Sequence, residues 1–458
     1  MQASHDQRKR KMRLGAFIQA HGHHMAAWRH PEVAAAADTN FPHMVEIARM
    51  AERGLFDMLF SADVVGAAED DPEDLCMSSF VTRFEPITLF SALATMTTHI
   101  GLVCTSTTTY DEPYHIARRF AGLDIISGGR SGWNLVTSQN PFEAHNFGRD
   151  SHMALGDRYK KAEEFADVVR RLWDSWDDDA FLRDKESGRF FDPDKLHVLD
   201  HKGEFFRVRG PLNVARSPQG HPVMVQAGSS DDGKELAART AEVIFTAHQT
   251  IGDAQAFYSD VKGRLARYGR KPEHVLIMPG VYAMVGLTEA EAREKYEKLQ
   301  SLIHPRVGLK FLSRFLAHDV TQYPVDEPLP AHVDQQIVGS RPALLVKMAR
   351  REDLTIRQLY MRMAGARGHR QIFGTPVQIA DELEAWFADG AADGFNVMPP
   401  VLPGSLRDFV ELVIPELQRR GLFRTRYEGR TLRENLGLPY PPNQFSGARA
   451  TPQYTHGP

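Results

Sequence analysis

Cysteine is nearly absent from the sequence, with Cys76 and Cys104 the only two among 458 residues. So few thiols exclude a disulfide framework and favour a reducing compartment, and we therefore expect a cytoplasmic protein. Long apolar runs are absent as well, since no stretch approaches the roughly 20 residues that a membrane-spanning helix needs. The polar, basic start over residues 1–13 lacks the apolar segment of a secretory signal and is expected to be disordered.

Charge and motifs exclude several further classes. The 55 basic and 59 acidic residues leave a formal net charge of −4, so nothing favours a nucleic-acid partner or an anionic membrane. The sequence contains no nucleophile elbow, P-loop, H-E-x-x-H helix or C-x-x-C pair. Gly128 and Gly129 lack the G-x-G-x-x-G spacing of a dinucleotide-binding turn. His21, His23 and His24 cluster without a neighbouring cysteine or carboxylate, so we expect no metal site there.

What the chain does contain is a regular alternation of apolar runs and helical patterns. Short buried-strand patterns alternate with amphipathic segments of helical spacing, which is typical of a parallel sheet covered by helices. The apolar runs span residues 14–19, 55–62, 100–105, 133–138, 222–226, 243–247, 275–285 and 394–398. Strands of this kind predict the α/β class and a single (β/α)8 TIM barrel over residues 14–420.

Three segments depart from this alternation. Residues 177–210 are charged and broken by Gly and Pro, which predicts an excursion with a hairpin near residues 204–208. Residues 286–390 lose the rhythm, so we expect an insertion packed over the mouth of the barrel. Residues 421–458 are rich in Pro, Gly and Arg and are expected to form an extension over the surface or a neighbouring subunit.

Polar side chains stand where predicted strands end. The stretch 127–138, S-G-G-R-S-G-W-N-L-V-T-S, places Asn134, Thr137 and Ser138 at or near the carboxyl end of a buried strand. In an α/β barrel, ligands bind at that end. Asp63 follows the second run in the same way. Both observations also fit residues that only cap neighbouring elements, and the sequence leaves that alternative open.

A turn of small residues joins the fifth run to the next helix. Ala227, Gly228, Ser229 and Ser230 offer backbone N–H groups and hydroxyls at the positive end of that helix, which suits a phosphate. The next two residues are aspartates, which set negative charge beside this position. Aspartates also suit the first turn of any helix, so the phosphate hypothesis and the purely structural one both remain.

The other candidates indicate recognition rather than nucleophilic chemistry. Tyr159 lies in the first turn of a predicted helix, and His24 lies in a predicted loop at the pocket mouth. Arg362, Arg367 and His369 give the insertion a basic character that suits an anionic substrate, although solvated surface residues fit the same pattern. Hydroxyls, amides and histidines without an activated nucleophile are typical of a site that holds a cofactor with its own chemistry.

Eight ordered motifs resemble the bacterial-luciferase-like monooxygenases. They read L-G-A-F-I-Q…W-R-H-P, G-L-F-D-M-L-F-S-A-D-V, T-T-T-Y-D-E-P-Y, G-G-R-S-G-W-N-L-V-T-S, H-N-F-G-R-D, G-D-R-Y-K-K-A-E-E-F, V-M-V-Q-A-G-S-S and D-G-F-N-V-M-P-P. The resemblance runs from about residue 13 to 440 and is to the nitrilotriacetate monooxygenase component A group, which also holds alkane and dibenzothiophene sulfone monooxygenases. The insertion and the segment P-E-L-Q-R-R-G-L-F-R-T look most like the aminopolycarboxylate enzymes.

This resemblance implies a TIM barrel that binds reduced FMN, delivered by a separate NAD(P)H:FMN reductase, with O2 as co-substrate. It also implies a homodimer or higher homo-oligomer. Carried over position by position, it implies flavin contacts at Asp63, Thr105, Ser138, Tyr159, Ser229 and Ser230. One departure is Leu155, where many relatives have His, and His152 lies one turn off.

For the reaction, the resemblance implies that one oxygen atom enters a small, carboxylated amine, with C–N cleavage and release of glyoxylate. Gln139 stands where the alkane-oxidising member has His, which argues against that substrate class. A carboxylated substrate needs cations, and Arg362, Arg367 and His369 are the candidates. Oxygenation of a sulfone or thioether, and a flavin-binding protein without turnover, are the alternatives. The matched group favours FMN over coenzyme F420.

Overall fold

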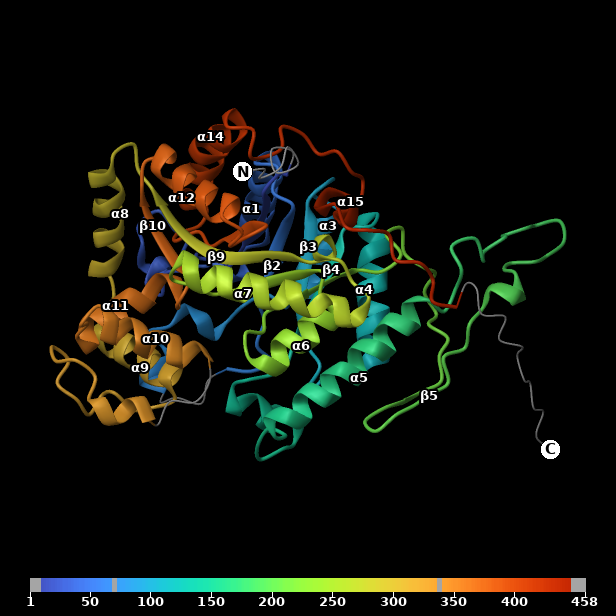
Figure 1. Ribbon diagram of the computed structural model, residues 1–458, viewed down its shortest axis with the longest axis horizontal. Coiled ribbons are helices and arrows are strands. Elements are labelled where there is room, and N and C mark those ends of the chain that lie inside the picture. The colour runs from blue at the N-terminus through green and yellow to red at the C-terminus, as the bar shows by residue number, and fades with distance from the viewer. Residues whose placement is uncertain (1–9, 68–71, 336–339, 446–458) are drawn as a thin grey trace.

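The computed structural model describes residues 10–67, 72–335 and 340–445, and within them eight parallel strands close into a barrel (Figure 1). The ring closes because β9 pairs with β11 on one side and with β8, the other end of the strand order, on the other. The predicted (β/α)8 fold is therefore confirmed. In chain order the ring strands are β1 (Arg13–Phe17), β2 (Met58–Ser61), β3 (Gly101–Thr107), β4 (Ser131–Val136), β7 (Val223–Gln226), β8 (Val243–Thr246), β9 (Leu276–Val285) and β11 (Gly394–Val397).

Helices follow the ring strands and cover the outside of the barrel. Their ends obey local rules: Pro113 opens α4 where a missing N–H costs nothing, and Gly128, with a φ of 69°, ends it. The last predicted helix is divided by a π-helical turn over Phe409–Val413. The covering helices are α1 (Phe41–Arg53), α3 (Pro86–Ala94), α4 (Pro113–Ser127), α5 (Leu155–Trp173), α6 (Asp231–Thr240), α7 (Ile251–Arg264), α12 (Pro376–Ala388), α13 (Gly404–Asp408) and α14 (Ile414–Arg419). No helix in the described ranges combines the length and the apolar character needed to span a membrane.

The amino end of the barrel is closed by the C-terminal segment. Inward side chains of the strands, such as Phe60 and Val225, form one apolar cluster with Leu432 and Leu436 of α15 (Leu432–Leu436). A Cβ at Gly101, the first residue of β3, would lie 2.4 Å from Leu432, so only glycine allows this close approach. The segment expected to run over the surface therefore contributes to the core, because its leucines fill the space beneath the strands.

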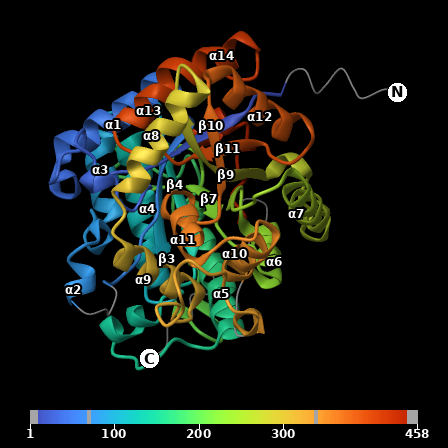
Figure 2. The same cartoon turned by 90° about the vertical axis from the view of Figure 1, so that its left-hand side faces the viewer.

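The insertion after β9 forms a helical layer. It comprises α8 (Glu289–Ser301), α9 (Pro305–Leu316), α10 (Ser340–Arg351), α11 (Ile356–Ala366) and one strand, β10 (Arg370–Gly374). The sequence did not predict β10, which pairs in parallel with the end of β9 and lies outside the closed ring. Leucines such as Leu312, Leu345 and Leu359 give α9, α10 and α11 an apolar cluster of their own. In Figure 2 these helices lie in front of the barrel strands.

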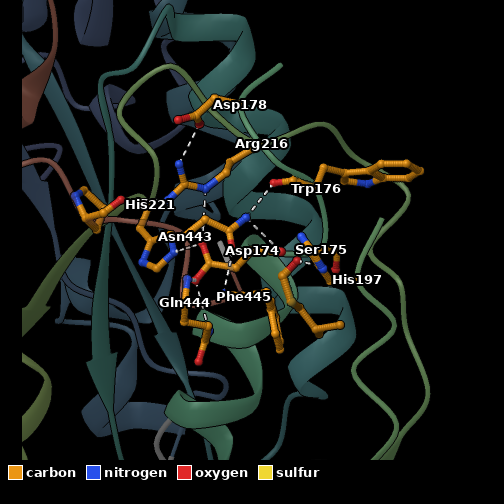
Figure 3. Close-up of polar contacts among 12 residues, drawn as sticks. Asp174, Ser175, Trp176, Asp178, His197, Arg216, His221, Asn443, Gln444 and Phe445 are labelled. Atoms are coloured by element: carbon orange, nitrogen blue, oxygen red, sulfur yellow. Dashed lines mark hydrogen bonds and ion pairs between the residues drawn. The ribbon is translucent and has the colours of Figure 1, made fainter. Parts of the chain in front are cut away.

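Residues 177–210 leave the barrel between α5 and β7 and project to one side (Figure 1). The predicted hairpin is present as β5 (His201–Lys202) paired antiparallel with β6 (Arg207–Val208). A buried carboxylate, Asp174, ties the base of this excursion to the C-terminal segment (Figure 3). Most of the N-terminus expected to be disordered (residues 1–9) and the end of the C-terminal extension (residues 446–458) lie outside the described residues.

Candidate active site

A cavity of about 1080 Å³ lies at the carboxyl ends of the barrel strands. Active sites of α/β barrels occupy this end, because the loops that follow the strands converge there. The volume leaves room for a cofactor together with a small substrate. Residues at the strand ends that line it are Phe17, Phe60, Asp63, Thr105, Thr107, Asn134, Ser138, Ala227, Phe245 and Met398.

Three of the predicted flavin contacts, Asp63, Thr105 and Ser138, line this cavity together. They come from three neighbouring strands, β2, β3 and β4, whose parallel pairing brings their carboxyl ends side by side. The Thr105 hydroxyl donates to the carbonyl of Ser61 at 2.8 Å. The Ser138 hydroxyl donates to Oε1 of Glu143 at 3.1 Å. The hydroxyls are thus held in fixed directions by the protein itself.

The carboxyl group of Asp63 occupies a partly desolvated part of the cavity. Burial raises its pKa to about 6, although the backbone N–H of Val64 and the charge of Arg83 act to lower it. The nearby carboxylates of Glu85 and Glu143 push the pKa further upward. Asp63 therefore takes up or releases a proton close to neutral pH, as groups in functional sites often do.

The other three predicted flavin contacts, Tyr159, Ser229 and Ser230, lie outside the cavity lining. The Tyr159 hydroxyl on α5 is 3.0 Å from Oγ of Ser230. Ser230 caps α6, since its Oγ accepts the N–H of Gly233 at 3.1 Å. Ala227, at the start of the same turn, does line the cavity. The turn therefore lies at the cavity edge with the amino end of α6 beside it.

The two aspartates after this turn are accounted for by the helix. Asp231 and Asp232 form the first turn of α6, where acidic side chains interact favourably with the helix dipole. The Asp231 carboxylate is mostly exposed and pairs with Arg264 on α7, with 2.5 Å between Oδ1 and Nη2. Its charge is thus offset by an arginine on the neighbouring helix, which weakens its opposition to an anion at the turn.

A further wall of the cavity comes from α9. Helix positions i, i+3, i+4, i+7 and i+8 share one face. On α9 this face carries Val307, Lys310, Phe311, Arg314 and Phe315, and all five line the cavity.

The two cations of this face differ in environment. Lys310 Nζ lies 3.4 Å from Oδ2 of Asp74, on the short helix α2 (Pro72–Leu75). Asp74 also forms an ion pair with Arg306, so α2 is held against α9. Burial lowers the pKa of Arg314, whose guanidinium nevertheless stays charged because arginine starts from so high a value. The α9 face therefore offers positive charge beside aromatic rings.

Two of the four predicted substrate contacts line the cavity. The Arg367 guanidinium lies 4.3 Å from the centroid of the Phe80 ring, in a cation–π arrangement. The His369 ring stacks on Phe245 with 4.9 Å between centroids. Both residues follow α11, in the G-A-R-G-H-R stretch that the sequence had singled out.

The other two, Arg362 and His24, lie outside the cavity lining. Arg362 Nη2 lies 3.7 Å from the carboxylate of Glu352, and its side chain is more than one-third exposed. His24 is fully buried, and burial lowers its pKa to about 3, so the ring is neutral. His23 beside it hydrogen-bonds through Nε2 to the carbonyl of Phe17 at 2.9 Å. The histidine cluster is thus packed into the wall behind the cavity.

Leu155, which departs from the family pattern, and His152 lie at and just before the start of α5. Leu155 is 52% exposed at the first position of the helix. His152 bridges two groups, with Nδ1 at 2.6 Å from the Tyr110 hydroxyl and Nε2 at 2.8 Å from the Asn140 carbonyl. Tyr110 lines the cavity, so His152 supports a cavity residue from behind.

Among the cavity residues that sequence reasoning missed are the charged residues Glu143, Lys310 and Arg314. Glu143 stands three positions after Asn140, the spacing of a capping box, and that signal could have marked it as a structured acid. Lys310 and Arg314 are four residues apart, like the phenylalanines at 311 and 315. This spacing could have indicated one helix face that mixes aromatic rings with cations.

Known proteins resemble this chain along almost its whole length. A family model described as luciferase-like monooxygenase matches residues 12–393. Nitrilotriacetate monooxygenase component A of Aminobacter aminovorans is 54% identical over 446 residues, covering 95% of this chain and 98% of that protein. N-acetyl-S-(2-succino)cysteine monooxygenase of Bacillus subtilis (strain 168) is 50% identical over 443 residues, covering 96% and 99%. The solved structure of an EDTA monooxygenase from Chelativorans sp. BNC1 superposes with a TM-score of 0.79 at 33% identity, covering 95% of this chain and 100% of that one.

Proposed function

The chain belongs to the luciferase-like, flavin-dependent monooxygenases, and from this membership we propose that it is the oxygenase of a two-component system. In this proposal a separate NAD(P)H:FMN reductase supplies reduced FMN, and O2 is the co-substrate. One oxygen atom enters a small, carboxylated amine, and the C–N bond then breaks with release of glyoxylate. The relative from Aminobacter aminovorans, named as a component A, supports the two-component arrangement.

The cavity residues fit a reduced flavin. Asn134 Oδ1 is buried and has no hydrogen-bond partner among the described residues, so it remains available to a ligand N–H. The hydroxyls of Thr105 and Ser138 line the same region. The Ala227–Ser230 turn, at the amino end of α6, suits the phosphate. A volume of about 1080 Å³ leaves space for a substrate beside the cofactor.

When bound, reduced FMN supplies the electrons that activate O2 for transfer of one oxygen atom. The protein's own residues position the reactants and exclude water. Phe60, Phe245 and Met398 make the inner wall of the cavity apolar, which keeps water away from the reacting atoms. The carboxyl group of Asp63, with its pKa near 6, holds or releases a proton at the cavity edge.

The α9 face carries the proposal of a carboxylated substrate. Its two cations, Lys310 and Arg314, line the cavity together with Arg367, which directly follows α11. Arginine forks match carboxylates in a bidentate geometry, and Lys310 adds a point charge. The names of the Aminobacter and Chelativorans relatives describe aminopolycarboxylates. The Bacillus relative is named for a thioether that also carries carboxylates, so a carboxylated thioether is the second candidate.

Turnover with an added reductase tests the proposed function directly. The purified protein, FMN, NADH and a generic flavin reductase should convert nitrilotriacetate with consumption of O2 and release of glyoxylate. Mass spectrometry of parallel reactions with a carboxylated thioether and an uncharged sulfone separates the substrate classes by a gain of one oxygen. Hydrogen peroxide as the sole product with every substrate would contradict the substrate proposal, and failure to bind reduced FMN would contradict the cofactor.

Replacing Arg314 by methionine should raise KM for a carboxylated substrate by about ten- to a hundredfold. Hydrogen bonds to charged groups contribute roughly 1.5–3 kcal/mol, and methionine keeps the apolar bulk without the charge. KM for an uncharged sulfone should stay within about twofold. Arg293→Met is the matched control, because Arg293 is exposed on α8 and pairs with Glu289. Equal effects of the two variants would remove the α9 face from substrate recognition.

A further inference from the structure

A directed hydrogen-bond chain runs along the cavity wall from β3 to the loop after β4. Glu143, as a carboxylate, only accepts hydrogen bonds, so the Ser138 hydroxyl donates to its Oε1 at 3.1 Å. The single hydroxyl hydrogen of Ser138 is then used. Thr107, whose Oγ1 lies 3.0 Å from Oγ of Ser138, must therefore be the donor in that pair. Thr107 in turn accepts the N–H of Thr109 at 3.1 Å.

Glu143 sets the direction of this chain because both of its oxygens are already acceptors. The N–H of Val65 reaches Oε1 at 3.3 Å, and the N–H of Asn140 reaches Oε2 at 3.0 Å. The side chain is 3% exposed, so water does not substitute for these partners. Ser138 and Thr107, both in the cavity lining, are left with unused lone pairs and no unused hydroxyl hydrogen.

A second chain, carried by neighbouring residues, has the same polarity. Thr105 donates its hydroxyl to the carbonyl of Ser61 at 2.8 Å, so it can only accept from Asn134. Asn134 Nδ2 makes that bond at 2.8 Å. The amide orientation follows, and Oδ1 points away from Thr105 with no partner among the described residues. Asn134 is 2% exposed and lines the cavity. Both chains therefore end in hydrogen-bond acceptors.

We propose that the acceptor array formed by these two chains (Thr105, Thr107, Asn134 and Ser138) selects the reduced over the oxidised flavin. Glu143 is the positioning residue that fixes the direction of the hydrogen bonds in the first chain. The inference rests on the proposed function. A reduced isoalloxazine ring carries at least one more N–H donor than the oxidised ring, whose corresponding nitrogen is an acceptor. A wall that offers acceptors alone pairs with the added N–H and leaves the oxidised nitrogen without a donor. An unmatched buried polar group is costly, so the two redox forms bind with different affinities.

Redox-dependent binding of FMN tests this role without turnover. Dissociation constants for oxidised and anaerobically reduced FMN come from fluorescence titration, and the midpoint potential of bound FMN comes from an anaerobic spectroscopic titration. Glu143→Met removes the acceptor and frees the Ser138 hydroxyl hydrogen to face the cavity. The preference for reduced FMN should fall about tenfold, which lowers the potential of bound FMN by ~30 mV for a two-electron couple. A purely structural role would weaken both redox forms alike and leave the potential unchanged.

Glu143→Gln is the matched rescue variant: with its amide oxygen toward Ser138 it still accepts that hydroxyl, while the charge and the acceptor of the Asn140 N–H are lost. We expect its potential to return close to that of the unmodified protein. A potential like that of Glu143→Met would assign the effect to charge and overturn the inference. If Glu143→Met does not fold, as judged by circular dichroism, Ser138→Ala must lower the potential, and an unchanged value overturns the inference. Failure of the unmodified protein to bind FMN in either form would instead contradict the proposed function.

Discussion

Replacing Asp174 by alanine should lower the free energy of unfolding by about 3 kcal/mol, because it leaves two buried N–H donors, Nε of Arg216 and Nε2 of His221, without an acceptor. Oδ1 of Asp174 accepts from Nε of Arg216 at 3.1 Å and from Nε2 of His221 at 2.6 Å (Figure 3). Only 1% of the Arg216 side chain is exposed. Oδ2 holds Gln444 of the C-terminal segment at 3.0 Å. One carboxylate therefore joins α5, the start of β7 and the C-terminal segment.

Acid should destabilise this site in two steps, first through His221 and then, at lower pH, through Asp174. Burial raises the pKa of Asp174, but the hydrogen bond and charge of His221 and the charge of Arg216 bring it below the ordinary value. A depressed folded pKa contributes stability above the unfolded pKa of about 3.9, and that stability is lost as the pH falls through the folded pKa. Burial lowers the pKa of His221, so protonation of the unfolded chain below about pH 6.5 already favours unfolding.

Urea denaturation followed by circular dichroism at pH 7.5 and pH 4 measures both effects. The difference between the unmodified protein and Asp174→Ala should persist at pH 4, which lies above the unfolded pKa of aspartate, while the unmodified protein should itself be less stable at pH 4 than at pH 7.5 because His221 takes up a proton on unfolding. Asp178→Ala is the matched control, since Asp178 binds the same guanidinium at 2.6 Å but is 60% exposed. Exposed ion pairs contribute roughly 1 kcal/mol or less, so this control should change little. Equal decreases in the free energy of unfolding of the two variants would show that the buried carboxylate of Asp174 stabilises the fold no more than the exposed one of Asp178.

The barrel was predictable because each ring strand leaves a local signal. Residues 133–138 combine an apolar core with polar residues at the carboxyl end, and β4 with the adjoining cavity wall confirms that interpretation. Parallel pairing brings the carboxyl ends of such strands to one face, so Asp63, Thr105 and Ser138 could be placed near each other from chain order alone. Short-range patterns were sufficient for this part of the fold.

The remaining features depend on contacts between residues far apart in the chain. Leu432 reaches the barrel interior from more than 300 positions beyond β3. The sequence around it is rich in Pro, Gly and Arg, and this composition predicts only an extension. Arg314 and Arg362 are the same residue type in the same insertion, yet one lines the cavity and the other faces Glu352. Helical periodicity says which residues share a face, but tertiary packing decides whether that face meets solvent or a cavity. β10 was missed for a related reason, because its pairing partner is the far end of β9.

Replacing Ser229 by aspartate should weaken FMN binding by about a thousandfold. The Ala227–Ser230 turn precedes α6, whose amino end favours an anion. A carboxylate about 4 Å from a phosphate charge costs ~4 kcal/mol at an effective dielectric constant of 20, which corresponds to about three factors of ten in affinity. The Asp231 carboxylate does not already impose this cost, since it pairs with Arg264. Titration of protein fluorescence with reduced FMN gives the dissociation constants.

Ser229→Asn separates charge from shape in this experiment. Asparagine has the size of aspartate without its charge, so it should weaken binding by less than about tenfold, the effect of one lost hydrogen bond. Riboflavin, which lacks the phosphate, should bind the aspartate variant and the unmodified protein with similar affinity. Raising the ionic strength should recover part of the lost FMN affinity, because salt screens the repulsion at this partly exposed turn. Similar losses with aspartate and asparagine, or an equal loss for riboflavin, would place the phosphate away from the Ala227–Ser230 turn and leave the carboxyl ends of β2, β3 and β4 as the binding surface.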